Sequence, residues 1–301
     1  MDPMDTLLSV EELTYRYGER VAVDRVSLEV NRGEVFGLLG PNGAGKTTFI
    51  SCLAGLLTPA SGSLWFDGAA FTPRTRPEQR AQLGLVPQET AVYDELSARE
   101  NLDFFARLLG AADVDAAVAA GLQLAGLDGR ADERVETYSG GMKRRLNLAC
   151  ALVHDPPVLL LDEPTVGVDP QSRNHLFDNI EELRGQGRTI LYTTHYMEEA
   201  QRLCDRVAIM DHGKILALDT VPALIERYGG PSLIEAELET PPADGNHAGT
   251  WDGQTLRIPS ERPLEEIARL AGSGVRFTSL HLKRPDLETV FLELTGRSLR
   301  D

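Results

Sequence analysis

The fold is decided by the stretch Gly40–Thr48, which reads GPNGAGKTT. It matches the pattern Gly-x-x-x-x-Gly-Lys-Ser/Thr, whose glycines let successive backbone N–H groups face a bound anion. The apolar run 35–39 before it is typical of a buried strand, and residues 46–57 after it predict a helix. We therefore expect a phosphate group at this helix N-terminus, the alternative being a glycine-rich turn without a ligand. In the first case Lys46 reaches the β- and γ-phosphates of a nucleotide, and the Thr47 hydroxyl binds magnesium.

Length and composition set the size and the class of the protein. With 301 residues, 42% hydrophobic and 25% charged, the chain has room for one large domain and a small one around a substantial core. The formal net charge of −16 argues against a nucleic-acid partner or an anionic lipid surface, because both favour clustered Lys and Arg. The three cysteines, Cys52, Cys150 and Cys204, are scattered in apolar stretches, which predicts buried free thiols.

Nothing in the sequence indicates a signal peptide or a membrane span. The N-terminal residues MDPMD are acidic and lack the apolar core of a signal peptide. No apolar run approaches the roughly 18 residues that a membrane-spanning helix requires. We therefore expect a soluble chain that reaches a membrane only through a partner protein.

The order of apolar patterns predicts an α/β fold. Leu7–Tyr17 and Val21–Val30 alternate as antiparallel strands around a turn at 18–19. Residues 94–152 are helix-forming and predict a helical subdomain inserted into the core. Strands and helices alternate in the remainder of the core, which predicts a parallel, doubly wound sheet. The expected strands there are 83–87, 158–163, 189–193 and 207–210, and the expected helices are 171–185 and 197–204.

A smaller domain is expected after the Gly-Gly-Pro turn at 229–231. Short elements follow in the order β-β-α-β-α, with a Pro- and Gly-rich loop at 241–249. The expected elements are strand 233–238, strand 256–258, helix 264–270, strand 275–282 and helix 286–294. We thus predict a nucleotide-binding domain over 1–230 and a small α+β accessory domain over 231–301.

Polar side chains end several of the predicted strands. Asp162 and Glu163 end the apolar run 158–161, at the sheet edge where ligands gather in α/β folds. Asp162 is placed to bind magnesium through water and Glu163 to polarise a water molecule, whereas a helix N-cap is the structural alternative. Gln88 and His195 end neighbouring strands, and His195 would reach a γ-phosphate oxygen there.

A second anion site is predicted at Tyr138-Ser139-Gly140-Gly141-Met142. Ser139 is a suitable N-cap, and the paired glycines leave backbone N–H groups uncovered at the positive end of a helix. The basic run 143–145 that follows is interpreted as a solvated helix face.

Taken together, these motifs resemble the ATP-binding subunits of ATP-binding-cassette (ABC) transporters. The resemblance covers residues 7 to about 228, with seven motifs in the family order. The family's Walker A loop matches Gly40–Thr47, and its Walker B strand with the catalytic glutamate matches Val158–Asp162 with Glu163. Its Q-loop glutamine matches Gln88, its signature residues match Ser139, Gly140 and Gly141, and its D-loop aspartate matches Asp169. Its switch histidine matches His195, and its adenine-stacking aromatic matches Tyr17. From the residue alone, an aromatic at a strand end such as Tyr17 is more often explained by packing than by stacking on a ligand.

The resemblance implies a P-loop NTPase core with an antiparallel β layer and a set of residue roles. Glu163 would be the catalytic base, assisted by His195, Gln88 and Lys46. ATP would be held by Tyr17, Asn42, Gly43, Ala44, Gly45, Lys46, Thr47 and Thr48, with Ser139, Gly140, Gly141 and Asp169 contributed across a dimer. Magnesium would be held by Thr47, Gln88 and Asp162.

The family also implies partners and a mode of action. Two cassettes pair head to tail with ATP between them, and hydrolysis to ADP and phosphate separates them. The partners would be integral membrane transporter subunits, at the cytoplasmic face of the cell membrane. The tail Asp286–Gly296 resembles the ending of bacterial drug- and antibiotic-exporting ATPases, which favours export.

Two positions depart from the usual Leu-Ser-Gly-Gly-Gln signature, because Tyr138 and Met142 occupy its ends. The backbone donors remain, so phosphate binding is expected to persist. The alternative function is a soluble ABC ATPase of DNA repair or ribosomes, although no long coiled coil and no second cassette is visible. A P-loop kinase or GTPase would not need the Ser-Gly-Gly helix.

Overall fold

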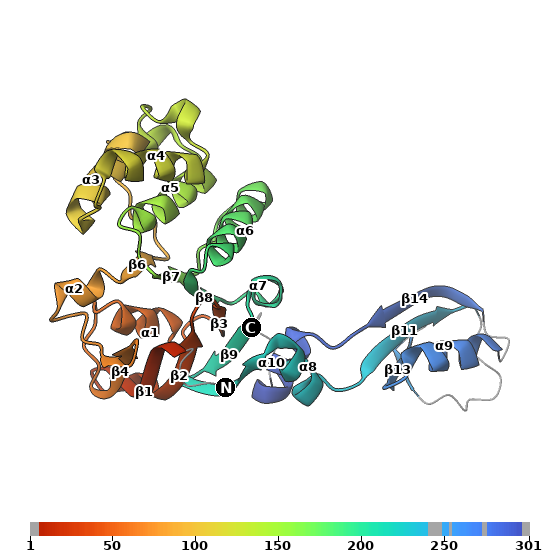
Figure 1. Cartoon of the computed structure of the whole chain (residues 1–301). Helices are drawn as coiled ribbons and strands as arrows, with labels where there is room; N and C mark the ends of the chain where they lie inside the picture. Colours follow the sequence, from red (N-terminus) through yellow and green to blue (C-terminus); the bar gives the residue numbers. More distant parts are fainter. Residues whose placement is uncertain (1–5, 240–248, 253–254, 273–275, 297–301) are drawn as a thin grey trace. The chain divides into compact units, whose positions relative to one another are not determined.

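The computed structural model describes residues 6–239, 249–252, 255–272 and 276–296 (Figure 1). The chain divides into two compact units, of which the first ends at Thr220 and the second begins at Val221. This division lies ten residues before the expected boundary at residue 230, because helix α8 (Val221–Tyr228) packs against the last helix, α10 (Leu287–Thr295).

A six-stranded sheet in the order β10-β9-β3-β8-β7-β6 forms the centre of the first unit. Its strands are β3 (Val35–Leu39), β6 (Leu83–Val86), β7 (Val158–Asp162), β8 (Thr189–Thr194), β9 (Arg206–Asp211) and β10 (Lys214–Thr220). All neighbours are parallel except β10, which returns antiparallel to β9. The parallel, doubly wound core is therefore confirmed, and the edge strand β10 is an addition that the sequence did not predict.

The central strands are buried on both faces, as their continuous apolar sequences require. Every residue of β3 and β7 is buried. Alternate side chains of β3 pack into two different cores. Phe36 and Leu38 lie in the core with helix α1 (Lys46–Leu53) and the antiparallel layer. Val35 lies in the core with helix α6 (Pro170–Gly185) and helix α7 (Met197–Leu203).

The antiparallel layer has the strand order β2-β1-β4-β5. It comprises β1 (Thr6–Tyr17), β2 (Arg20–Asn31), β4 (Ser61–Phe66) and β5 (Ala69–Ala70). The turn at 18–19 brings Tyr17 opposite Arg20. This confirms the first predicted hairpin and places an aromatic side chain at the end of the layer, close to the phosphate-binding loop.

The helical subdomain contains α3 (Ala98–Leu109), α4 (Val114–Ala125) and α5 (Gly140–Leu152), which Figure 1 shows grouped together, and α5 contacts β6 of the sheet. Short 3-10 turns η1 (Asp128–Arg130) and η2 (Val135–Thr137) connect α4 to α5. Ser97 caps α3 in a reciprocal arrangement with Glu100, and Asp113 caps α4. A short helix α2 (Pro77–Arg80) precedes β6. The subdomain lies within the expected residues 94–152.

Helix α1 is shorter than the sequence suggested. The prediction was a helix over 46–57, but α1 ends at Leu53. Gly55 has φ of 72°, a left-handed conformation that glycine adopts easily and that ends helices.

The second unit contains an antiparallel sheet in the order β12-β13-β11-β14 with α9 packed on β11 and β13. Its elements are β11 (Ser232–Leu238), β12 (Thr250–Asp252), β13 (Thr255–Ser260), α9 (Pro263–Gly272) and β14 (Phe277–Lys283). The predicted order is present, with β12 as an unpredicted strand. Residues 241–248 of the predicted loop lie outside the described residues.

Among the described residues, no helix is long and apolar enough to cross a membrane. Cys52 and Cys150 are buried and Cys204 is partly buried, and all three are free thiols, as predicted. Burial raises the pKa of Cys52 and of Cys150 to about 12 and raises that of Cys204 further.

Candidate functional site

The loop between β3 and α1 places its backbone donors at a helix N-terminus. Gly45 is the N-cap of α1, with φ of 110° and no side-chain cap on the helix. A Cβ atom at Gly45 would lie 2.3 Å from the carbonyl oxygen of Ala22, so only glycine fits. The first N–H groups of α1 therefore remain available to an anion, as the loop motif predicted.

Lys46 lies almost entirely buried at the start of α1. Its Nζ donates to the carbonyl oxygens of Gly40 at 2.6 Å and Pro41 at 3.0 Å, and forms an ion pair with Glu163 Oε1 at 2.9 Å. A buried ammonium group that is held among oxygens in this way has the charge and the position to bind phosphate oxygens.

Asp162 ends β7 and faces the same loop. Its Oδ1 accepts a hydrogen bond from the Thr193 hydroxyl at 2.7 Å, and the Thr47 hydroxyl is its other side-chain partner. Burial raises the pKa of Asp162 above its ordinary value, although both hydroxyl groups favour the ionised form. A hydroxyl and a carboxylate oxygen from two predicted magnesium ligands therefore meet, and hard oxygen donors of this kind suit Mg²⁺.

Glu163 follows β7 in a backbone conformation that is uncommon for a residue with a side chain. Its φ is 44°, and its N–H donates to Thr193 Oγ1 at 3.0 Å. Its side chain bridges two predicted catalytic residues: Oε1 pairs with Lys46, and Oε2 lies 3.0 Å from His195 Nδ1. The structure thus joins Lys46, Glu163 and His195 in one chain of polar contacts.

A cavity of about 350 Å³ opens beside these side chains. It is lined by Tyr17, Arg20, Ala22, Asn42, Gly43, Gly45, Lys46, Thr47, Thr48, Gln88 and Glu163. Of the predicted nucleotide ligands in the phosphate-binding loop, only Ala44 is missing from this lining, because it is buried in the core. Tyr17 lines this cavity and is 53% exposed, and its ring centroid lies 4.9 Å from that of Tyr15 in an edge-to-face arrangement.

Arg20 and Ala22 are site residues that sequence reasoning missed. Both lie on β2, opposite the end of β1, and they reach the cavity because the hairpin turn brings β2 beside Tyr17. The predicted hairpin ended its first strand at Tyr17 and began its second at Val21, so the pairing of Arg20 with Tyr17 is visible only in the structure.

The predicted signature and D-loop residues do not line this cavity. Ser139 caps α5 by accepting from Met142 N at 3.3 Å, and it is exposed together with Gly140. Gly141 is buried against α6. Asp169 caps α6 by accepting from Ser172 N at 3.0 Å. Hydrogen bonds from Ser172 lower the pKa of Asp169.

Tyr138 and Met142, which depart from the usual signature sequence, pack and hydrogen-bond within their own chain. Tyr138 is buried, its hydroxyl donates to the carbonyl oxygen of Arg130 at 2.6 Å, and Arg130 lies over its ring. Met142 Sδ accepts from Arg130 at 3.4 Å. These side chains therefore stabilise the loop that precedes α5.

The prediction that residues 143–145 form a solvated face is wrong. Arg144 is buried and donates to backbone carbonyl groups of two other segments. Arg145 donates to the carbonyl oxygen of Ala125, and Lys143 pairs with Asp94 at 2.8 Å. The three basic residues hold α5 to its surroundings because the long side chains reach partners beyond the helix.

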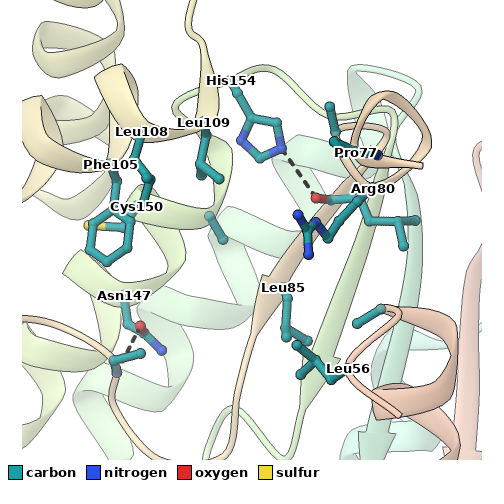
Figure 2. A pocket seen from close by; sticks show the side chains of 15 residues that line it. Leu56, Pro77, Arg80, Leu85, Phe105, Leu108, Leu109, Asn147, Cys150 and His154 are labelled. Atoms are coloured by element: carbon teal, nitrogen blue, oxygen red, sulfur yellow. Dashed lines mark hydrogen bonds between the residues drawn. The ribbon is translucent and has the colours of Figure 1, made fainter. Parts of the chain in front are cut away.

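A separate apolar groove of about 410 Å³ lies between the sheet and the helical subdomain. Figure 2 shows Phe105, Leu108 and Leu109 of α3 on one side and Leu56 and Leu85 on the other. His154 lies at its upper end, where Nε2 contacts the carbonyl oxygen of Leu83 at 3.2 Å. Leu108 is 63% exposed, so the groove offers apolar surface to solvent.

Comparisons with known proteins agree with this geometry. The pattern of the ABC transporter family matches residues 23–166. The linearmycin resistance ATP-binding protein LnrL of Bacillus subtilis (strain 168) is 38% identical over 98% of this chain and 100% of its own length. The Nod factor export ATP-binding protein I of Cupriavidus metallidurans is 42% identical over 99% of this chain and 100% of its own length.

A solved structure described as the ATP-binding subunit of an ABC transporter superposes with a TM-score of 0.67. It is 31% identical in sequence and covers 74% of this chain and 94% of its own. This solved structure shares the nucleotide-binding fold described above. The chain therefore belongs to the family of ATP-binding subunits of ABC transporters.

Proposed function

We propose that this chain powers an exporter by binding and hydrolysing ATP at the cavity between Tyr17 and Glu163. The observation that carries the proposal is the contact chain Lys46–Glu163–His195 beside the uncapped N-terminus of α1. It combines phosphate-binding donors with a carboxylate that can take a proton, which ATP hydrolysis requires.

In the proposed reaction Glu163 takes a proton from water as the water oxygen attacks the γ-phosphorus. The bond from that phosphorus to the bridging oxygen breaks, and ADP and phosphate leave. Lys46 and the N–H groups of the loop bind the phosphate oxygens, and His195 binds the γ-phosphate. Tyr17 stacks on the adenine ring, while Asn42, Gly43, Ala44, Gly45 and Thr48 complete the nucleotide cradle.

Thr47 and Asp162 would hold magnesium, with Gln88 at the rim of the same cavity. The adjoining hydroxyl and carboxylate fit this ion, and when bound it supplies positive charge for the β- and γ-phosphates.

A second copy of the cassette completes the site in this proposal. Ser139, Gly140 and Gly141 lie at an exposed helix N-terminus away from their own cavity, which suits binding to the nucleotide of another chain. Asp169 would join the same interface. ATP then holds two cassettes together, and its hydrolysis releases them, which can drive a bound partner between two conformations.

The proposed partner is an integral membrane subunit that inserts a short amphipathic helix into the apolar groove. The groove is the right kind of surface because exposed Leu56, Leu108 and Leu109 line it. It is also connected to the nucleotide cavity: Ala91 lines the groove, and Gln88 lines the cavity three residues earlier. This partner would place the chain at the cytoplasmic face of the membrane.

Export is proposed over import on the names of the full-length relatives, which are an antibiotic resistance protein and a Nod factor export protein. They match nearly the whole chain, including the second unit. Nothing in these relatives favours the soluble alternative in DNA repair or on ribosomes.

The test is Glu163→Gln in the full chain. The amide keeps the side-chain shape but cannot accept the proton, so ATP binding and ATP-dependent dimerisation should persist while turnover falls by about 100-fold or more. Light scattering with and without ATP measures the dimer, and phosphate release measures turnover. Unimpaired phosphate release from this variant would show that Glu163 is not the base.

A further inference from the structure

Arg144 is a buried arginine of α5 whose hydrogen bonds all go to backbone carbonyl oxygens of other segments. It lies in the second turn of α5 and is 3% exposed. Its guanidinium donates to five backbone carbonyl oxygens. They are Pro87 at 2.7 Å, Gln88 at 2.9 Å, Asp162 at 3.3 Å, Glu163 at 3.0 Å and Pro164 at 2.5 Å.

These acceptors belong to two segments that both reach the nucleotide cavity. Nη1 bonds the carbonyl groups of residues 87 and 88, which lead into the Q-loop. Nη2 and Nε bond residues 162–164, the turn that carries the proposed base. The planar guanidinium of Arg144 therefore holds both segments to α5. The single ammonium group of a lysine at this position could not donate to both segments at once.

No carboxylate within the described part of the chain forms an ion pair with Arg144, so carbonyl dipoles surround its charge. Burial lowers the pKa of Arg144 to about 10, which leaves the group protonated at neutral pH. The carbonyl oxygens are thus held by a charged donor, and such hydrogen bonds are stronger than neutral ones.

The backbone of Glu163 needs this support. Its φ of 44° lies in the left-handed region, which disfavours residues with a side chain. Thr193 holds its N–H from one side, and Arg144 holds its carbonyl oxygen from the other. The direction of the Glu163 carboxylate toward Lys46 and His195 therefore depends on both anchors.

We propose that Arg144 is a positioning residue that couples the signature helix to hydrolysis. It holds the backbone of Glu163 and of Gln88 to α5, so that a displacement of α5 moves the base and the Q-loop together. Ser139–Gly141 begin the same helix. Binding of these residues to the second copy's nucleotide therefore changes the position of Glu163 in their own chain. The inference rests on the proposed function, in which Glu163 is the base and Ser139–Gly141 bind across the dimer.

Arg145 provides a matched control on the same helix. It is partly buried, and its guanidinium donates to Ala125, within the helical subdomain. Substitution of Arg145 perturbs the packing of α5 without touching the segments that Arg144 holds. Loss of packing and loss of positioning are therefore separable.

The experiment compares Arg144→Lys with Arg145→Lys in the full chain. For Arg144→Lys we expect kcat to fall by about 10-fold or more while KM for ATP changes by less than about 3-fold, because binding groups stay in place and the base does not. For Arg145→Lys we expect kcat within about 2-fold of the wild type, although its unfolding temperature falls about as far as that of Arg144→Lys.

A second variant tests the same bonds chemically. Arg144→Ala leaves a space of the shape of the lost guanidinium, so millimolar guanidinium chloride should restore part of kcat. Urea and sodium chloride at the same concentration should not restore it. Rescue of this kind is not expected if the side chain only stabilises the fold.

Each outcome bears on the inference. It is overturned if Arg144→Lys keeps wild-type kcat while Glu163→Gln is inactive, and in that case the proposed function stands. It is also overturned if both arginine variants lose kcat in parallel with their unfolding temperatures and guanidinium gives no rescue. Full activity of Glu163→Gln would instead remove the proposed base, and with it the reason for positioning that residue.

Discussion

Asp162 carries a charge that the fold makes costly to bury. Burial raises its pKa, so the folded chain holds this proton more tightly than the unfolded chain does. The cost of burying this charge is absent at pH values below the pKa of Asp162 in the unfolded chain. It grows as the pH rises toward the higher pKa of Asp162 in the folded chain and is complete above that pKa. At neutral pH the carboxylate therefore lowers the stability of the chain without nucleotide, in exchange for a group that can bind magnesium.

We accordingly expect Asp162→Asn to raise the unfolding temperature while it lowers ATP hydrolysis by about 100-fold or more. The gain in unfolding temperature should be larger at pH 7.5 than at about pH 4, where the wild-type carboxyl group is nearer its neutral form. Thermal unfolding with a chelator and without nucleotide measures both. A variant that unfolds at a lower temperature than the wild type at pH 7.5 would contradict the burial argument.

At the residue scale, the sequence predicted most of the cavity because its chemistry depends on short, fixed spacings. Lys46, Glu163 and His195 were expected near one another, and the structure gives their contacts. Arg144 was misjudged because a basic run looks the same whether it faces water or reaches backbone carbonyl groups. Only the folded positions of the two distant segments distinguish these cases.

The contact between α5 and α6 depends on one glycine. A Cβ atom at Gly141 would lie 2.0 Å from Ser172 Oγ and 2.4 Å from its Cβ. A Cβ atom at the neighbouring Gly140 would meet nothing within 4 Å. The first glycine of the pair is therefore free of packing constraints in this chain, and the second allows two helices to approach closely.

We expect Gly141→Ala to lower the free energy of unfolding by about 1–3 kcal/mol, because α5 must move away from α6. Gly140→Ala should change it by less than about 0.5 kcal/mol. Adding Ser172→Gly to Gly141→Ala should recover part of the loss. Denaturant unfolding measures all three variants, and equal losses for both alanine variants would show that the clash is not the cause.

At the element scale, the sequence predicted types of element better than their ends. Helix α1 was expected to continue to residue 57, yet Gly55 turns the chain away. Strand β12 was missed because its three residues are too few to form a pattern and gain stability from pairing with β13. Strand β10 was missed although residues 215–218 are apolar, and the structure pairs it with β9 at the edge of the sheet.

On the scale of the molecule, the apolar groove predicts how the chain attaches to its membrane partner. Leu108→Glu should place a charge on an exposed groove wall, so the chain should fold normally but lose its partner. Affinity capture from detergent-solubilised membranes of the host, followed by identification of the bound proteins, measures this. The wild type is expected to recover a protein with several membrane spans, and Leu108→Glu at least about 10-fold less of it.

Leu264→Glu is the control, because Leu264 is an exposed leucine of α9 in the second unit, 69% accessible. It should recover the partner as the wild type does. Equal recovery by Leu108→Glu would exclude the groove, whereas ribosomes or DNA in place of a membrane protein would favour the soluble alternative.

The division into two units could be predicted only approximately. The Gly-Gly-Pro turn suggested residue 230, yet the division falls after Thr220 because α8 packs with α10. A pairing between helices of which one ends at Tyr228 and the other begins at Leu287 leaves no local signal, since each apolar face could pack equally well against another partner.

The low acidity of the three native thiols has a practical consequence for spectroscopy. Cys52, Cys150 and Cys204 all have raised pKa values, so they exist almost entirely as unreactive thiols at neutral pH. A single cysteine introduced on the exposed start of α5 would then be the preferred target of a maleimide dye. Fluorophore pairs could follow the meeting of two cassettes in real time, in a protein that keeps every one of its own cysteines.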